Sequence, residues 1–448
     1  MIPLADAPPG PAELPSGGDP GRWPFLQRLR RLPHLDPEPW LRAIETGALQ
    51  PEADLLAALA EHWSADAPLR LLRWWAAQPA RDPQLPLVVG IRRNPALAAW
   101  LLAQLQADPL LQLGRPPELL AALLSLLGHQ RDARAWPLLR AWAQAPIPTS
   151  LRRSALEGLA LGLPVWPRAA LRRCLLELAA DLDPQLAATA VDLLARLPGC
   201  RRQLVPLSRL ALEPAVAGRL QRRLAATPVQ PLLLVVHGRS GGELPSELLS
   251  LAAELEQRRG APVRLQALSA SAPPDGEPLL AAGLPLTLVP LLLLPGGHVR
   301  QDVPAIAAHW RRRTRVQRQP FLGAWPCWQQ ALRSELQALA GAAEPGQGRP
   351  LLLHHPLAGA LAQRYLALLE RATGCRTLAT PYSAPEPEDP PLRFAAPALP
   401  LVLAANRLTE RLGGTGLDGT VLGDTVGLPL LQRPALRAVL LDALEALP

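Results

Sequence analysis

A change of pattern near Thr227 constrains the fold of this chain more than any other feature. Before this point, amphipathic segments of helical period follow one another between proline-containing breaks. After it, continuous apolar runs alternate with such segments, which is typical of buried strands in a parallel sheet. The chain of 448 residues also exceeds the roughly 100–200 residues of an ordinary domain. The sequence therefore predicts a multidomain protein with an all-α part followed by an α/β part.

The all-α part is expected over residues 21–228, after a Pro- and Gly-rich stretch at 1–20 that we expect to be a flexible tail. One apolar helix face recurs in it with the same spacing, first as Leu151, Ala155, Leu156 and Leu159 and then as Leu186, Ala190, Val191 and Leu194. This recurrence resembles two helix-turn-helix units of a HEAT-like repeat, which stack to bury a continuous core. Such an array presents a surface for a protein partner, whereas an irregular helical bundle without a partner is the alternative.

The α/β part divides into two similar lobes, predicted at 229–341 and 350–448, on either side of the Gly- and Pro-rich segment GAAEPGQGRP. In the first lobe the predicted strands are LLLVV, VRLQALS and LTLVPLLLL, with helices at 243–258 and 299–313. In the second lobe LLLHH, RTLATPYS and LPLVLAAN follow in the same order. This order indicates an internal duplication of one α/β unit.

Composition excludes several classes of protein. The formal charge of +8 comes from arginines interleaved with acidic residues, without the motif of a nucleic-acid-binding module, so we expect no nucleic-acid partner. The four cysteines form no CxxC pair, which predicts reduced thiols rather than a zinc site or a disulfide framework. Apolar runs fall short of the roughly 20 residues that cross a bilayer, and the N-terminus lacks a secretory pattern. We therefore expect a cytoplasmic protein with no membrane partner.

Two histidines follow strands of the first predicted lobe. His237 comes directly after the first apolar run, in LLLVVHGRSGG, and His298 follows the third, in LLLLPGGHVRQD. The carboxyl ends of parallel strands open at one edge of the sheet, where ligands of α/β proteins bind. A neutral imidazole can bind a divalent metal or accept a proton near neutral pH. The sequence therefore predicts His237 and His298 as a catalytic pair and as metal ligands.

The segments LLLVVHG and VPLLLLPGGHVRQDVPAI resemble the two signature segments of class II tetrapyrrole chelatases, the CbiX-like family of sirohydrochlorin cobaltochelatases and ferrochelatases. The resemblance extends more weakly over about 231–448 and matches a two-lobed form. It implies a lyase that inserts Co²⁺ or Fe²⁺, as substrate metal, into sirohydrochlorin without ATP, in siroheme or cobalamin biosynthesis. No tightly bound cofactor is implied. Insertion requires two pyrrole protons to leave as the ion enters, which suits a pair of imidazoles.

Sirohydrochlorin is a polycarboxylate, and arginine forms bidentate hydrogen bonds with carboxylates. The residues predicted to bind it stand beside the two histidines and are Arg239, Ser240, Gly296, Gly297 and Arg300. The second lobe offers His354 and His355 where the first has His237, and we expect them to be ordinary strand-end residues rather than cleft residues. The position corresponding to His298 falls near Asn406, so one site is expected, in the first lobe.

Two departures from the family pattern leave alternatives open. Gly238, Arg239, Ser240 and Gly241 replace the usual Gly-Ser-Arg-Asp after the first histidine, and Ser269 stands where family members often carry an acidic residue near the metal. One alternative is therefore a non-catalytic tetrapyrrole- or metal-binding protein with a HEAT-like partner-binding domain. In another, the helical repeat carries the whole function and the α/β part is a scaffold.

Overall fold

The structure is a computed structural model, and it describes residues 8–64, 66–78, 85–90, 92–105, 109–112, 114–270, 272–341, 348–380, 394, 396–406, 408–409, 412 and 428–448. The chain forms two compact units, one of Met1–Leu197 with Leu210–Arg223 and one of Pro198–Arg209 with Leu224–Pro448. The domain boundaries and the flexible tail inferred from the sequence stay predictions. Among the described residues, no helix is long and apolar enough to cross a membrane.

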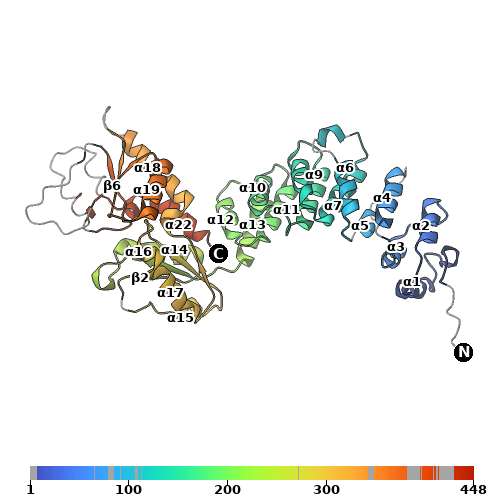
Figure 1. The fold of residues 1–448 in the computed structure, drawn as a ribbon, viewed down its shortest axis with the longest axis horizontal. Coiled ribbons are helices and arrows are strands. Elements are labelled where there is room, and N and C mark those ends of the chain that lie inside the picture. The colour runs from blue at the N-terminus through green and yellow to red at the C-terminus, as the bar shows by residue number, and fades with distance from the viewer. Residues whose placement is uncertain are drawn as a thin grey trace, which may run out of the picture. The chain divides into compact units, whose positions relative to one another are not determined.

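The first unit is helical (Figure 1). Its elements are η1 (Pro11–Glu13), α1 (Arg22–Arg31), α2 (Glu38–Glu45), α3 (Ala53–Leu59), α4 (Ala67–Ala77), α5 (Leu85–Val89), α6 (Pro95–Gln104), η2 (Pro109–Gln112), α7 (Pro117–Gln130), η3 (Ala133–Ala135), α8 (Trp136–Gln144), α9 (Thr149–Leu161), α10 (Arg168–Ala179), α11 (Pro184–Ala195) and α13 (Pro214–Ala226). Contacts run along two rows, because α1, α3, α5, α7, α9 and α11 each touch the next, as do α2, α4 and α6, and α8 touches α10. Two rows of stacked helices confirm the predicted helical-repeat fold.

The recurring helix face lies in the core of this unit. Leu151 is 2% exposed, and the other seven residues of the two matched sets are 0% exposed. Helices α7 and α9 approach each other closely at two glycines, since a Cβ on Gly128 would lie 2.2 Å from the carbonyl oxygen of Gly158. The absence of side chains at this crossing therefore lets the two backbones touch.

Replacing Gly128 by Ala is expected to destabilise the first unit by about 2 kcal/mol, because the added methyl group overpacks the crossing of α7 and α9. Alanine in an unhindered helix would instead stabilise by about 0.5–1 kcal/mol. Gly218→Ala in α13 is the matched control, since a Cβ there meets only Arg222 Nη1, at 3.6 Å. Urea unfolding followed by circular dichroism measures both variants, and stabilisation by Gly128→Ala would contradict the close crossing.

The second unit begins with α12 (Arg201–Leu207) and continues into the first lobe. The elements of this lobe are β1 (Leu232–Val236), η4 (Ser240–Gly242), α14 (Ser246–Arg259), β2 (Val263–Ala267), α15 (Glu277–Leu280), β3 (Leu286–Pro290), α16 (Gly297–Arg300), α17 (Asp302–Arg311), β4 (Val316–Arg318), η5 (Leu322–Ala324) and α18 (Pro326–Gly341). The four strands are parallel in the order β2-β1-β3-β4. Alternate residues of β1 enter two different apolar cores, which confirms a strand buried on both faces.

One predicted helix differs from the observed structure. The sequence predicts a single helix over 299–313, but α16 ends at Arg300 and α17 begins at Asp302. Pro304 explains the break, because its ring would clash with the carbonyl group of Arg300 in a continuous helix and it has no N–H to donate. The break separates the turn that carries His298 from the helix that packs on the sheet.

The second lobe repeats the first. Its described elements are β5 (Leu351–His354), α19 (Ala360–Thr373), β6 (Arg376–Ala379), β7 (Ala398–Pro400), η6 (Leu430–Gln432) and α22 (Pro434–Glu445). The strands are parallel in the order β6-β5-β7, which matches β2-β1-β3 of the first lobe. The two lobes share one apolar core, in which α18 packs on α19 and α22 packs on α14. The described part of the chain thus confirms parallel sheets in both lobes.

Candidate active site

A cleft of about 620 Å³ opens where β1 and β3 end, and residues of both lobes line it. The first lobe contributes 236–239 and the loop after β3, while the second contributes 355–357 and 401–406. Most lining residues are leucines and other apolar residues, with a few polar side chains among them. A concave apolar site with few polar groups is typical of a small-molecule site.

The structure brings His237 and His298 together in this cleft. Their ring centroids lie 4.9 Å apart, and the ring planes are perpendicular, at 90°. His298 Nδ1 lies 2.5 Å from Asp302 Oδ2. Because a carboxylate can only accept, Nδ1 carries the proton and Nε2 is the basic nitrogen of the neutral ring. His237 Nδ1 faces the carbonyl oxygen of Gly238 at 3.4 Å, which favours the same tautomer.

The backbone that carries His237 is held by close packing. Gly238 has a φ of +69°, and a Cβ on it would lie 2.7 Å from Ala267 Cβ. Ser269 Oγ donates to the carbonyl oxygen of Arg239, at 2.7 Å. Ser269 therefore fixes the loop after β1.

The predicted substrate-binding residues fall into two groups. Arg239, Gly296 and Gly297 line the cleft, and Arg239 makes only a loose ion pair with Glu243, at 3.8 Å. Arg300 is exposed and is not among the described lining residues. Ser240 begins η4, but its side chain lies outside the described part of the structure.

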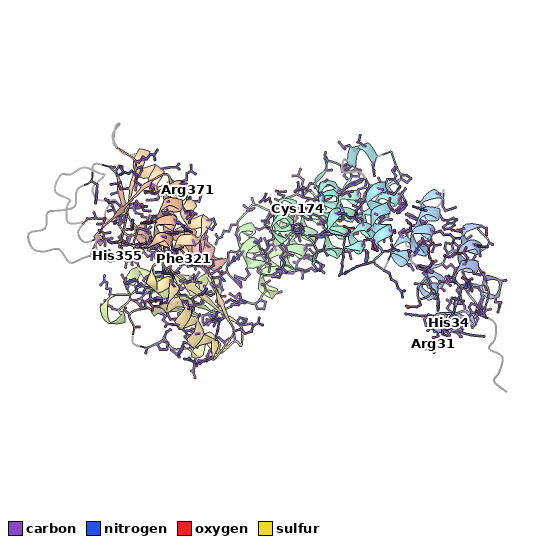
Figure 2. All side chains as sticks on the ribbon, viewed as in Figure 1. Arg31, His34, Cys174, Phe321, His355 and Arg371 are labelled. Carbon is purple, nitrogen blue, oxygen red and sulfur yellow. The ribbon has the colours of Figure 1, made fainter. Side chains whose placement is uncertain are left out.

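The two histidines of the second lobe differ from each other. His354 is 3% exposed and donates from Nδ1 to the carbonyl oxygen of His355, at 2.8 Å. His355, which Figure 2 labels, is exposed and lines the cleft. Asn406 also lines the cleft, and its Oδ1 accepts from the backbone N–H groups of Leu408 and Thr409. His354 is therefore a buried strand-end residue, while His355 faces the site.

Sequence reasoning missed two residues that support the site. Asp302 could have been found, since it stands four positions after His298, where side chains on one helical turn meet. Tyr365 gave no such signal. Its hydroxyl shares its one proton between the carbonyl oxygens of Leu293, at 3.0 Å, and Gly323, at 2.9 Å, across the two lobes. Burial raises the pKa of Tyr365 far above its ordinary value, so the hydroxyl remains a donor.

The site is poor in metal ligands. Within the described ranges, no group of three or more His, Cys, Asp or Glu side chains is placed to hold a metal ion. The two imidazoles would leave most coordination positions of a metal open to other ligands. An open coordination shell suits an ion that is passed on to a substrate better than one kept as a structural metal.

Replacing Asp302 by Asn is expected to weaken the binding of Co²⁺ to the free protein by about tenfold or more. Partners that orient a ligating histidine typically contribute about 10–100-fold to metal affinity. Both side chains of the pair are about half exposed, at 49% and 50%, so stability should change little. Equilibrium dialysis with Co²⁺ measures the effect, with the exposed Glu243→Gln as the control. Equal affinities of Asp302→Asn and wild type would contradict this role.

A comparison with known protein families finds a match over the segment that contains His237 and His298. The model of the CbiX family matches residues 231–339, from the start of β1 into α18. A search of curated proteins finds no match. Two solved structures of Haemophilus influenzae LpoA match with 13% and 15% identity over 87% of this chain and 76% of theirs. Their TM-scores of 0.23 and 0.21 are too low to support a shared fold.

The matched region contains both histidines and every strand of the first lobe. The match supports chelatase-type insertion of a metal ion into a tetrapyrrole. Residues 231–339 are therefore similar to the CbiX family of class II chelatases.

Proposed function

We propose that this protein inserts Co²⁺ or Fe²⁺ into sirohydrochlorin without ATP, in siroheme or cobalamin biosynthesis. The observation that carries the proposal is the perpendicular pair of His237 and His298, with ring centroids 4.9 Å apart, in a cleft beside the segment that matches the CbiX family. The macrocycle would lie on the apolar walls of the cleft, where exclusion of water strengthens electrostatic interactions. Arg239 at the same cleft can pair with a carboxylate of the macrocycle.

The two imidazoles supply the two functions that insertion needs. An unprotonated Nε2 binds the incoming ion, and the other Nε2 accepts a pyrrole proton. Asp302 holds the ring of His298 through Nδ1. When the ion moves into the macrocycle, the imidazole that held it is released for the next ion.

A protein that binds a tetrapyrrole or metal without turnover is the second candidate. Ser269 favours it, because this side chain holds the loop after β1 and adds no negative charge near the metal. Tight binding of sirohydrochlorin without the absorption change of metal insertion would select this function. A protein partner of the helical repeat and a cytoplasmic location stay predictions.

His237→Ala and His298→Ala are each expected to lower the rate of Co²⁺ insertion by about 10²–10⁴-fold, the usual contribution of a positioned acid or base. The affinity for sirohydrochlorin should change much less, since the walls and Arg239 would still bind it. The double variant should be little worse than the worse single one, because the two residues act as a unit. Anaerobic absorption spectroscopy follows insertion, and near-normal rates in either single variant would refute the pair.

Removing residues 1–226 is expected to leave a folded protein with the activity of the full chain, because both histidines lie beyond the deletion.

The structure adds that α12 belongs to the second unit, where Arg209 pairs with Asp442 at 2.6 Å and with Glu445 at 2.9 Å. A fragment of 198–448 should therefore resist urea better than 227–448. Unfolding curves and insertion rates of both fragments test this, and an inactive but folded 227–448 would show that the site needs the preceding residues.

A further inference from the structure

The duplication places a third imidazole in the cleft. In the first lobe Leu291 N–H donates to the carbonyl oxygen of Val235, and in the second Leu401 N–H donates to that of Leu353, both at 2.8 Å. Val235 and Leu353 are therefore equivalent, and two residues further on His237 corresponds to His355. The equivalence follows from hydrogen-bond register rather than from sequence similarity.

His355 is held in the tautomer of a base. Its Nδ1 lies 3.0 Å from the carbonyl oxygen of Pro356. A carbonyl oxygen can only accept, so this contact favours the tautomer with the proton on Nδ1, in which Nε2 is the basic nitrogen. His237 and His298 also direct Nδ1 at an oxygen of the chain. The contact at Nδ1 thus favours the same tautomer, with a basic Nε2, in all three cleft imidazoles.

A role for His355 follows from the number of protons that the proposed insertion reaction releases, and it therefore rests on that proposed function. Two pyrrole protons must leave for each divalent ion that enters the macrocycle. A nitrogen that holds the ion cannot accept a proton at the same time, so the pair supplies one acceptor while the ion is held. A further base would let both protons leave before the ion is released into the macrocycle, and His355 is the remaining histidine among the described residues that line the cleft.

We propose that His355 is a catalytic residue that accepts a pyrrole proton at Nε2. The pyrrole N–H bond breaks, its electron pair stays on the pyrrole nitrogen to bind the ion, and a new N–H bond forms on His355. The side chain is exposed, so the imidazolium can release the proton to water before the next turnover. His355 comes from the wall of the second lobe, whereas His237 and His298 come from the first lobe.

The test uses the full-length protein with sirohydrochlorin and Co²⁺ under anaerobic conditions. His355→Ala is expected to lower the insertion rate by about 100-fold or more. The dissociation constants of sirohydrochlorin and of Co²⁺ alone should change little, and added imidazole should restore turnover. His355→Gln, which keeps the size of the side chain without a base, should show the same loss. His309→Ala, an imidazole outside the lining of the cleft, should insert at the wild-type rate.

The outcomes separate this proposal from the proposed function. Near-normal insertion by His355→Ala, with an active wild type, overturns the role of His355 and leaves the chelatase intact. Loss of insertion together with weaker Co²⁺ binding and no rescue by imidazole makes His355 a ligand and overturns its role as base. A wild type that binds sirohydrochlorin without inserting Co²⁺ overturns the chelatase itself, and the role of His355 with it.

Discussion

The cleft depends on the apolar core that the two lobes share. The last helix of each lobe packs in it against the first helix of the other lobe, α18 on α19 and α22 on α14. Trp328 of α18 is 1% exposed, and Leu440 and Leu444 of α22 are 1% and 0% exposed. Burial of such side chains typically stabilises by about 1.5–3 kcal/mol each. Separating the lobes would expose this core, so the two walls of the cleft are held together by the same burial that folds each lobe.

The buried guanidinium of Arg259 also holds the C-terminal end of α22 against the first lobe. Arg259, 4% exposed, lies at the end of α14 and donates to the carbonyl oxygens of Leu444, Glu445 and Leu447 at 2.9–3.0 Å. Burial lowers the pKa of Arg259 to about 9, so the guanidinium remains charged at neutral pH. The last carbonyl groups of a helix lack partners within the helix and carry its negative dipole end. A buried cation at this place therefore satisfies them and ties α22 to the first lobe.

The two lobes differ at residues that support the candidate site. Gly260 and Gly374 end α14 and α19 in the same left-handed conformation, so Tyr365 is equivalent to Leu251. Tyr365 alone has a hydroxyl, and it holds Leu293 in the loop that leads to His298. Phe321 packs beside it, with ring centroids 5.6 Å apart. The second lobe, which has no counterpart of His298 among its described residues, thus supports the loop that carries this residue in the first.

The sequence predicts those features that depend on strand order or on a periodic pattern, and it does not predict single contacts between distant segments. The proximity of His237 and His298 was predictable because both follow parallel strands, and parallel strands end at the same edge of a sheet. The repeat faces were predictable because a 3.6-residue period shows burial directly. The roles of Ser269 and Tyr365 were not, since each depends on a hydrogen bond to a backbone group of a distant segment. Such contacts leave no periodic signal.

The same limit applied to His355. Two adjacent histidines at a strand end look alike in sequence, yet consecutive side chains of a strand point to opposite faces, so only the register decides which one enters the cleft. The register places His354 in the core and His355 in the site. Three imidazoles with Nδ1 directed at oxygens of the chain give the cleft nitrogen atoms that can either bind an ion or accept a proton. Such atoms suit a reaction in which the ion must leave the protein and the protons must enter it.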